Sequence, residues 1–350
     1  MSPAPAAAGR NINGAVMASK RKIKIGLIDF DGKIVNLALM KLSAWHKSQD
    51  DTVILNPQTN SQVDKAYCSV IFSKNRDKAA RLADMFSDIQ FGGTGWDLKT
   101  ILPPEIEAMK PDYGLYTCAD VYKRLAGIMT KKKKVEKAGV IVNAGIGFTS
   151  RGCIRSCGFC VVPEKEGKLH ETAAVGDLIN PKSNVVILLD NNFTASPDCL
   201  DKLREIKERN LIIDITQGID VRTLTPEIAR ALSEVRHLRS IHYAWDLIPH
   251  EPMVMEGINI LSGFIKKYKH LCFTLVGYNS TFEEDLYRFR KLEEMNIDPY
   301  VMVYNSSADV KLHHFARWVN SRIYKTCKSF EDYWPWVKYK EGLNYVSENC

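Results

Sequence analysis

The chain alternates short apolar runs with longer segments whose apolar residues recur at helical spacing. The stretch KIKIGLIDFDG (residues 22–32) predicts a buried strand that ends in an acidic turn, and NLALMKLSAWHKSQ (36–49) predicts a helix. Three further strands are expected in TVILN, AYCSVIFS and DIQFGGTG, with a helix over KAARLADMF. Strand–helix alternation with glycine after the strands favours a doubly wound parallel sheet over residues 23–116.

The alternation resumes at Gly145 with longer helices. Strands are predicted in GIGFTS, NVVILLD, LIIDIT, SIHYAW, CFTLVG and YVMVYN, and helices in PDCLDKLREIKERN, TPEIARALSEV, MVMEGINILSGFIKKY and TFEEDLYRFRKLEEMN. Ser196, Thr225 and Thr281 are placed as helix start signals. Six strand–helix units predict a partial (βα)6 TIM-type barrel over residues 145–310, three-quarters of the eight-fold form. The whole chain is therefore expected to be of the α/β class.

Three segments lie outside these two predicted domains. Residues 1–22 are expected to form a disordered tail, because they are rich in small residues and lack a continuous apolar core. Residues 117–144 are interpreted as a connector or insertion, with a helix over ADVYKRLAGIM and a strand over AGVIVNAGI. Residues 311–350 form an aromatic-rich extension, expected to pack over the barrel; stacking on an aromatic substrate or on nucleic acid is the alternative.

The charge and composition of the chain limit the classes of partner that it is expected to bind. The chain has 350 residues, 45% hydrophobic content and a formal net charge of +7. No apolar run approaches the roughly 20 residues that span a bilayer, so a membrane partner is not expected. A cytoplasmic location is predicted because the tail lacks an export signal and most cysteines show no paired spacing typical of disulfides; a transit peptide is the alternative for the tail. The positive charge permits an anionic partner, but nucleic acid is not favoured because no aromatic residues interleave with the lysines of KKKKVEK (131–137).

Three of the nine cysteines, Cys153, Cys157 and Cys160, lie within eight residues in the pattern C-x-x-x-C-x-x-C. Thiolates bind zinc or iron–sulfur clusters. A structural zinc site needs four ligands, and only Cys157 and Cys160 form the usual C-x-x-C pair, although His170 offers a fourth. A cubane cluster held by three cysteines leaves one iron without a protein ligand, and that iron can bind a substrate or a cofactor. We expect the loop to follow the first barrel strand.

This motif, with Phe159 before the last cysteine and the flanking stretches TSRGC and FCVVP, resembles the radical S-adenosylmethionine (radical SAM) superfamily, an Fe–S oxidoreductase family. It is similar to the subgroup whose barrel follows a cobalamin-binding-like domain. The resemblance implies that Cys153, Cys157 and Cys160 hold a 4Fe–4S cluster whose fourth iron chelates S-adenosylmethionine. It further implies an enzyme that cleaves this cofactor reductively to a 5′-deoxyadenosyl radical. The substrate is unidentified, and flavodoxin or ferredoxin is the expected reductant.

The resemblance also implies further cofactor-binding residues, placed after successive barrel strands. They are Phe159 beside the adenine, Asp190, Asn191 and Asn192 in LLDNNFT, Gln217 and Arg222, Asp246 in HYAWD, and Gly277 in LVGYN. Each has a structural alternative. Phe159 can be a core residue, the D-N-N stretch can form a turn before the next helix, and Arg222 can pair with Asp220.

The N-terminal domain leaves cobalamin open as a second cofactor. Gly92 and Gly93 in FGGTG suit a loop that approaches a ring closely, yet the D-x-H-x-x-G motif of some cobalamin proteins is missing. A cobalamin-dependent radical SAM methyltransferase is therefore one alternative function. A nucleic-acid-binding or assembly protein with a structural cluster is the other. A methylthiotransferase is not expected, because the N-terminal domain lacks a second set of three cysteines.

Overall fold

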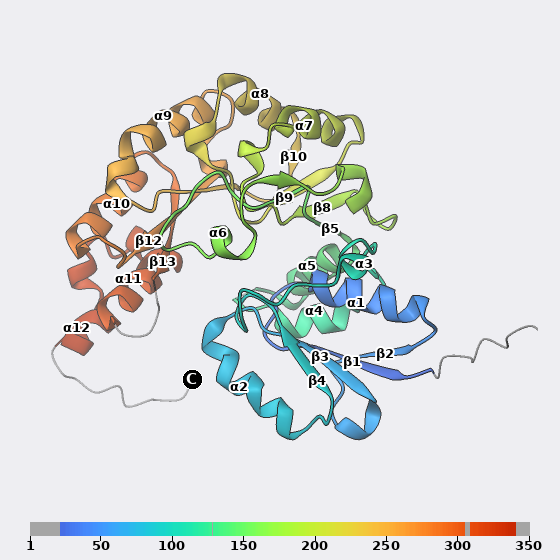
Figure 1. The fold of residues 1–350 in the computed structure, drawn as a ribbon. Coiled ribbons are helices and arrows are strands. Elements are labelled where there is room, and N and C mark those ends of the chain that lie inside the picture. The colour runs from blue at the N-terminus through green and yellow to red at the C-terminus, as the bar shows by residue number, and fades with distance from the viewer. Residues whose placement is uncertain (1–21, 128, 305–308, 341–350) are drawn as a thin grey trace, which may run out of the picture.

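The computed structural model describes residues 22–127, 129–304 and 309–340, so most of the predicted tail lies outside the described residues. Figure 1 shows two lobes: a smaller one built by the N-terminal elements, and an arc built by the elements that follow. Both lobes consist of parallel strands covered by helices, which confirms the predicted α/β class.

The N-terminal lobe contains a four-stranded parallel sheet with the order β2-β1-β3-β4. Its strands are β1 (Lys24–Asp29), β2 (Thr52–Leu55), β3 (Lys65–Ser69) and β4 (Ile89–Gly92). Side chains of β1 alternate between two cores: Ile25 and Leu27 pack with α1 (Leu37–Ser48), and Ile28 packs with α2 (Arg76–Ala80). Helices cover both faces of this parallel sheet, and successive connections place β2 on one side of β1 and then β3 and β4 on the other, which is the predicted doubly wound arrangement.

Helices α3 (Pro104–Glu107), α4 (Cys118–Arg124) and α5 (Lys131–Asn143) lead from this sheet to the arc. The predicted strand over residues 138–146 is wrong in its first part, because residues 138–143 belong to α5. The run Val140-Ile141-Val142 resembles a strand, but burial follows helical spacing: Ala138 and Ile141 are buried and three residues apart. Thr130 caps this helix by accepting a hydrogen bond from the Lys133 backbone N–H.

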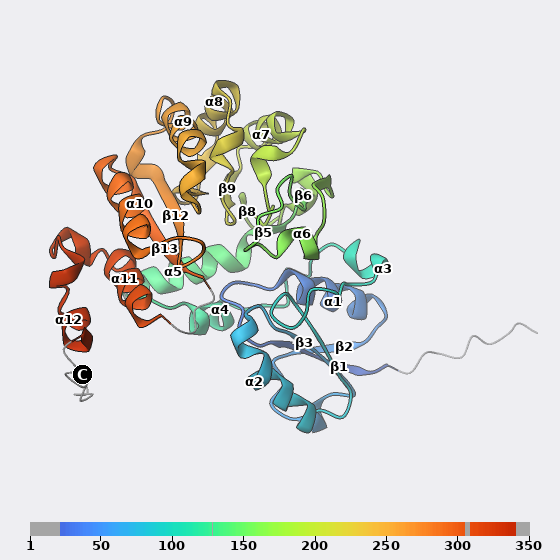
Figure 2. The same ribbon diagram turned by 60° about the vertical axis from the view of Figure 1, so that its left-hand side comes forward.

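Helix α5 belongs to a hydrophobic cluster that both lobes share. Ala138 and Ile141 lie in one contiguous core with Leu27 of the N-terminal sheet and with Val185 and Ile187 of the arc. In Figure 2, α5 runs between the N-terminal sheet and the strands of the arc. The lobes therefore bury apolar surface against the same helix.

The arc contains two parallel sheets. The first has the order β10-β9-β8-β5 and contains β5 (Gly145–Gly147), β8 (Val185–Leu188), β9 (Ile212–Ile215) and β10 (Arg236–His237). The second has the order β11-β12-β13 and contains β11 (Ile241–Ala244), β12 (His270–Val276) and β13 (Asp298–Val303). One isolated bridge between Ile219 and Tyr243 connects the two sheets. Among the described residues β13 does not pair with β5, so the arc is open.

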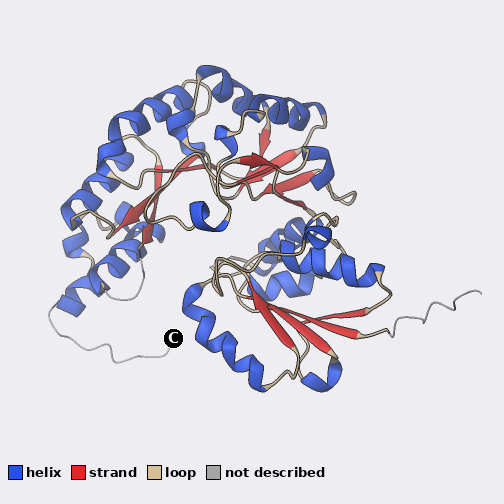
Figure 3. Ribbon diagram, viewed as in Figure 1, coloured by secondary structure: helices blue, strands red, loops and turns tan. Residues whose placement is uncertain are grey.

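Helices line the outer side of the arc, as Figure 3 shows. They are α7 (Cys199–Glu208), α8 (Pro226–Glu234), α9 (Glu251–Ser262), α10 (Phe282–Glu294) and α11 (Val310–Asn320). Thr225 and Thr281 cap α8 and α10 as predicted. The prediction for Ser196 is wrong: α7 begins at Cys199, and the Ser196 hydroxyl instead accepts from the Asp198 backbone N–H at 3.2 Å. Beyond α11, Phe330 and Trp336 pack with Phe289 of α10.

A buried ion pair between Arg124 and Asp29 closes the carboxyl end of β1. The Tyr116 hydroxyl also donates to Asp29 at 2.7 Å. We expect Arg124→Ala to lower the free energy of unfolding by about 3 kcal/mol, because it leaves a buried carboxylate unpaired. Urea denaturation would measure the loss. Tyr116→Phe removes two hydrogen bonds, one donated to Asp29 and one accepted from the Asn36 N–H, but keeps the ion pair and should cost less, about 2 kcal/mol; equal losses for both variants would contradict this ranking.

Candidate functional site

The three cysteines lie on one long loop that a short antiparallel ladder closes at its base. Strand β6 (Ser150–Arg151) pairs with β7 (His170–Glu171), and the one-turn helix α6 (Val162–Lys165) lies inside the loop. Gly152, at the start of the loop, has a φ of +78°, and a Cβ there would lie 2.3 Å from the Lys168 carbonyl oxygen. The ladder therefore requires glycine directly before the first cysteine.

Asp190, Asn191 and Asn192 follow β8 and hold successive parts of the loop base. The Asp190 carboxylate accepts four hydrogen bonds from Thr149 and Ser150, including the Ser150 backbone N–H at 2.7 Å. Asn191 Oδ1 accepts from the Gly152 N–H at 2.9 Å, and Asn192 Nδ2 donates to Cys153 Sγ at 3.3 Å. These contacts show what the three residues do in the described chain; their predicted contacts with a cofactor stay predictions.

The cysteine thiols lie close enough to influence one another's pKa. Burial raises the pKa of Cys157, Arg222 opposes this shift, and Cys160 and Cys153 raise the pKa further. Burial also raises the pKa of Cys160; a backbone N–H opposes this shift, and Cys153 adds to it.

Within the part of the chain that the structure describes, no three His, Cys, Asp or Glu side chains are grouped closely enough to hold a metal ion. A cavity of about 530 Å³ adjoins Cys153 on the side of Ser156, His170 and Pro197.

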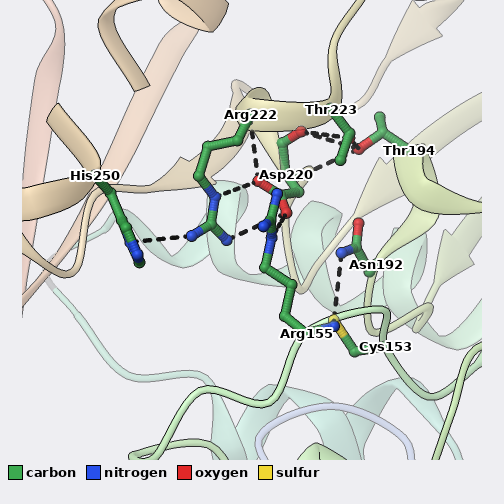
Figure 4. Close-up of polar contacts among 8 residues, drawn as sticks. All are labelled: Cys153, Arg155, Asn192, Thr194, Asp220, Arg222, Thr223 and His250. Atoms are coloured by element: carbon green, nitrogen blue, oxygen red, sulfur yellow. Dashed lines mark hydrogen bonds and ion pairs between the residues drawn. The ribbon is translucent and has the colours of Figure 1, made fainter. Parts of the chain in front are cut away.

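Arginine side chains surround Asp220 next to the cysteine loop (Figure 4). Arg155, from within the loop, donates to Asp220 at 2.6 Å, and Arg222 donates to the same carboxylate at 2.7 Å. Burial would raise the pKa of Asp220, but these two arginines together hold it below its usual range. Arg222 also contacts His250 Nδ1 at 3.1 Å. Burial and Arg222 lower the pKa of His250, so its ring is neutral at pH 7 and accepts this hydrogen bond.

Arg222 therefore forms the pair with Asp220 that was the structural alternative, while it remains close enough to Cys157 to affect its pKa. Asp246, after β11, affects the same thiol. The structure thus brings Arg222 and Asp246 together with the cysteines. The sequence patterns did not single out Arg155 or His250, and only the position of Arg155 between two cysteines was a signal.

The remaining predicted residues have separate surroundings. Phe159 contacts Tyr278 edge-on, with 5.3 Å between the ring centroids. Gly277 has a φ of +76°, and its N–H donates to Asp285 at 3.0 Å. Gln217 is exposed at the end of β9. Their contacts with a cofactor stay predictions.

The N-terminal lobe reaches the cysteine loop through alternating charges. Glu107 pairs with Lys41 of α1 at 2.7 Å and with Arg151 of β6 at 2.9 Å. Arg151 also pairs with Glu166, next to α6, at 3.1 Å. A second contact runs from Lys165 to the Thr100 carbonyl oxygen at 2.6 Å. The lobe therefore supports the loop from outside the arc.

The carboxyl edge of the N-terminal sheet does not fit a corrin ring. Arg124 and Tyr116 occupy the end of β1 through Asp29. Asp31 accepts from the Ile71 N–H at 2.7 Å and joins the loops that follow β1 and β3. A Cβ at Gly93, whose φ is +97°, would lie 2.4 Å from the Val70 carbonyl oxygen. The chain's own backbone thus explains this glycine without a bound ring.

Comparison with known proteins yields no family for the chain. No protein-family model and no curated protein matches it. Among solved structures, it resembles the crystal structure of Streptococcus suis SuiB bound to precursor peptide SuiA, with 13% sequence identity and a TM-score of 0.35. The match covers 56% of this chain and 53% of that one, so the chain spans about half of that protein. A likeness of this size does not establish a shared fold. None of the helices among the described residues has the length and apolar character needed to cross a membrane.

Removal of the Asp190 carboxylate should loosen the base of the cysteine loop. We expect amide hydrogen exchange at Thr149 and Ser150 to accelerate roughly tenfold or more in Asp190→Ala, since a hydrogen bond to a charged group contributes about 1.5–3 kcal/mol. Mass spectrometry of the peptide that contains both residues measures this. Asp201→Ala, at an exposed position of α7, is the matched control and should leave that exchange unchanged. Unchanged exchange in Asp190→Ala would contradict the anchoring role.

Asp246 should make stability depend on pH. Burial raises the pKa of its carboxyl to about 6, although Arg288 and Arg222 oppose the shift. The folded state then holds a proton that the unfolded state has already lost, so stability falls as pH rises from about 4 to 6. Relative to Asp246→Asn, we expect the wild type to lose on the order of 2 kcal/mol between pH 4 and 7. Denaturation midpoints across this range measure the difference, and parallel curves for the two proteins would refute it.

Proposed function

We propose that the chain is a radical SAM enzyme acting on a substrate that is not yet identified. The observation that carries this proposal is the C-x-x-x-C-x-x-C loop between the first two strands of a parallel arc, anchored by three side chains that follow the second strand, β8. In this proposal the strands β5, β8, β9, β11, β12 and β13 correspond to a partial (βα)6 barrel with the cysteines at its carboxyl end.

A four-iron cluster holds its cysteine sulfurs farther apart than a single metal ion does, so the three thiolates of this loop fit a cluster although they are not grouped closely enough for one ion. Cys153 and Cys160 each raise the pKa of Cys157, so three thiolates at this place repel one another unless a positively charged group lies between them. One buried acceptor near the loop is also unsatisfied: Asn192 Oδ1 has no hydrogen-bond partner among the described residues. An unsatisfied buried acceptor is costly, and the amino group of S-adenosylmethionine is a donor of the right kind.

When bound, the 4Fe–4S cluster would supply the electron for reductive cleavage of S-adenosylmethionine, and the resulting radical would abstract hydrogen from the substrate. Cys153, Cys157 and Cys160 would hold the cluster. Asp190 and Asn191 hold the backbone that presents Cys153. The Asp220–Arg155 pair fixes the loop between the first two cysteines, and Arg222 supplies positive charge next to Cys157.

The inner face of β11–β13 provides a candidate wall for the substrate. Tyr243 and Trp245 pack outward in the same core as residues of α9, so His242 faces the opposite side. Rings of His242, Phe273 and Tyr300 form a row across the three strands, with centroids 5.5 Å and 5.7 Å apart. Tyr300 is 42% exposed and Met302, two residues further along β13, is 48% exposed. We propose that this open aromatic face contacts the substrate.

Flavodoxin or ferredoxin is the reductant in this proposal.

The proposal is tested by anaerobic reconstitution with iron and sulfide, followed by reduction in the presence of S-adenosylmethionine. We expect 5′-deoxyadenosine to form and Cys157→Ala to abolish both the cluster and this product, because the variant lacks one of three ligands. Cys272→Ala is the control, since Cys272 is a fully buried residue of the hydrophobic core. Full iron content in Cys157→Ala would refute the ligand assignment. A wild-type cluster without the product, across a range of reductants, would favour a structural cluster.

A further inference from the structure

The side-chain amide of Asn192 faces two different environments. Its Nδ2 donates to Cys153 Sγ at 3.3 Å, while its Oδ1 is buried without a hydrogen-bond partner among the described residues. Figure 4 shows the nitrogen directed at the sulfur and the oxygen directed away from it. The residue is only 4% exposed, so an amide end without a hydrogen-bond partner is costly here.

The orientation of this amide follows from the chemistry of its neighbour. A thiolate can only accept hydrogen bonds, so the N–H₂ end must face Cys153 whenever that cysteine is deprotonated. The backbone on both sides restricts the position of the Asn192 side chain. Asn191 is hydrogen-bonded to Gly152, and Asn192 directly precedes the short 3₁₀ helix of residues 193–195. The donor is therefore held in place by the same anchorage that holds the loop.

Cys153 Sγ accepts hydrogen bonds from two N–H groups of the described chain. Besides Asn192 Nδ2, the Arg155 backbone N–H donates to Cys153 Sγ at 3.4 Å. Every N–H···S bond withdraws electron density from the thiolate and stabilises the more negative, reduced form of an attached cluster. The two donors differ in kind: the backbone donor comes from the loop itself, whereas the amide comes from a different strand–helix unit.

We propose that Asn192 sets the reduction potential of the cluster through its N–H···S bond to Cys153. This inference rests on the proposed function, since it requires the cluster to be held by Cys153. Asn192 raises the potential relative to a site without the donor, so that a physiological reductant transfers its single electron more readily. In this role it is a positioning and tuning residue, because it acts on the cluster through the cysteine.

The test compares cluster midpoint potentials of the reconstituted full chain without S-adenosylmethionine, by dithionite titration with mediator dyes and electron paramagnetic resonance detection. We expect Asn192→Ala to shift the midpoint to a more negative value. Asn192→Asp should shift it further, because it loses the donor and adds negative charge. Asn184→Ala is the matched control: it removes an exposed side-chain hydrogen bond to the Asn210 carbonyl at the amino end of β8, away from the cysteine loop, and should leave the midpoint unchanged.

Each other outcome would overturn the inference. A midpoint in Asn192→Ala that equals or exceeds that of the wild type would show that the N–H···S bond has no such effect. An equal shift in Asn184→Ala would show that the effect does not depend on the N–H···S bond. Failure of both Asn192 variants to bind iron, while Asn184→Ala binds it, would make Asn192 an assembly residue. Absence of a cluster in the wild type would instead refute the proposed function, and with it this inference.

Discussion

A buried carboxylate must be surrounded by hydrogen-bond donors, and Asp190 finds all of its described donors on Thr149 and Ser150. This requirement ties the end of β8 to the residues that lead into the cysteine loop. The neighbouring Asn191 and Asn192 then fall opposite Gly152 and Cys153 because the two segments run side by side. The conformation at the first cysteine is thus fixed by a charge that the chain could not otherwise bury.

The N-terminal lobe also contains a buried carboxylate, Asp29, that is surrounded by hydrogen-bond donors. Its sheet keeps the edge where a doubly wound fold usually binds a ligand, but Arg124, Tyr116 and Asp29 fill that edge from within. The lobe instead stabilises the arc and the cysteine loop. It shares the core of α5 with the arc and meets the cysteine loop through Glu107 and Arg151.

Periodicity predicted the parallel strands and most helices, because apolar spacing reports directly on which residues are buried. It failed over residues 138–143, where three β-branched or apolar residues in a row resemble a strand although the segment is helical. The cysteine spacing indicated the candidate site. Its supports were not predictable, since Arg124 meets Asp29 across 95 residues and Arg155 meets Asp220 across 65. Asn192 was expected to face a ligand, and no pattern in the sequence shows that its amide also reaches Cys153.

Among the residues that the structure describes, one isolated bridge, between Ile219 and Tyr243, joins the two sheets of the arc. Hydrogen bonds within each sheet form continuous ladders, whereas this seam depends on one backbone contact and on the packing of helices behind it. The cysteines and their anchors lie on one side of the seam, and Asp246 with the aromatic strands lies on the other. The hydrophobic core behind the seam is continuous and includes Ile219, Val221, Tyr243 and Trp245, so side-chain packing, more than backbone pairing, sets the distance between the two groups.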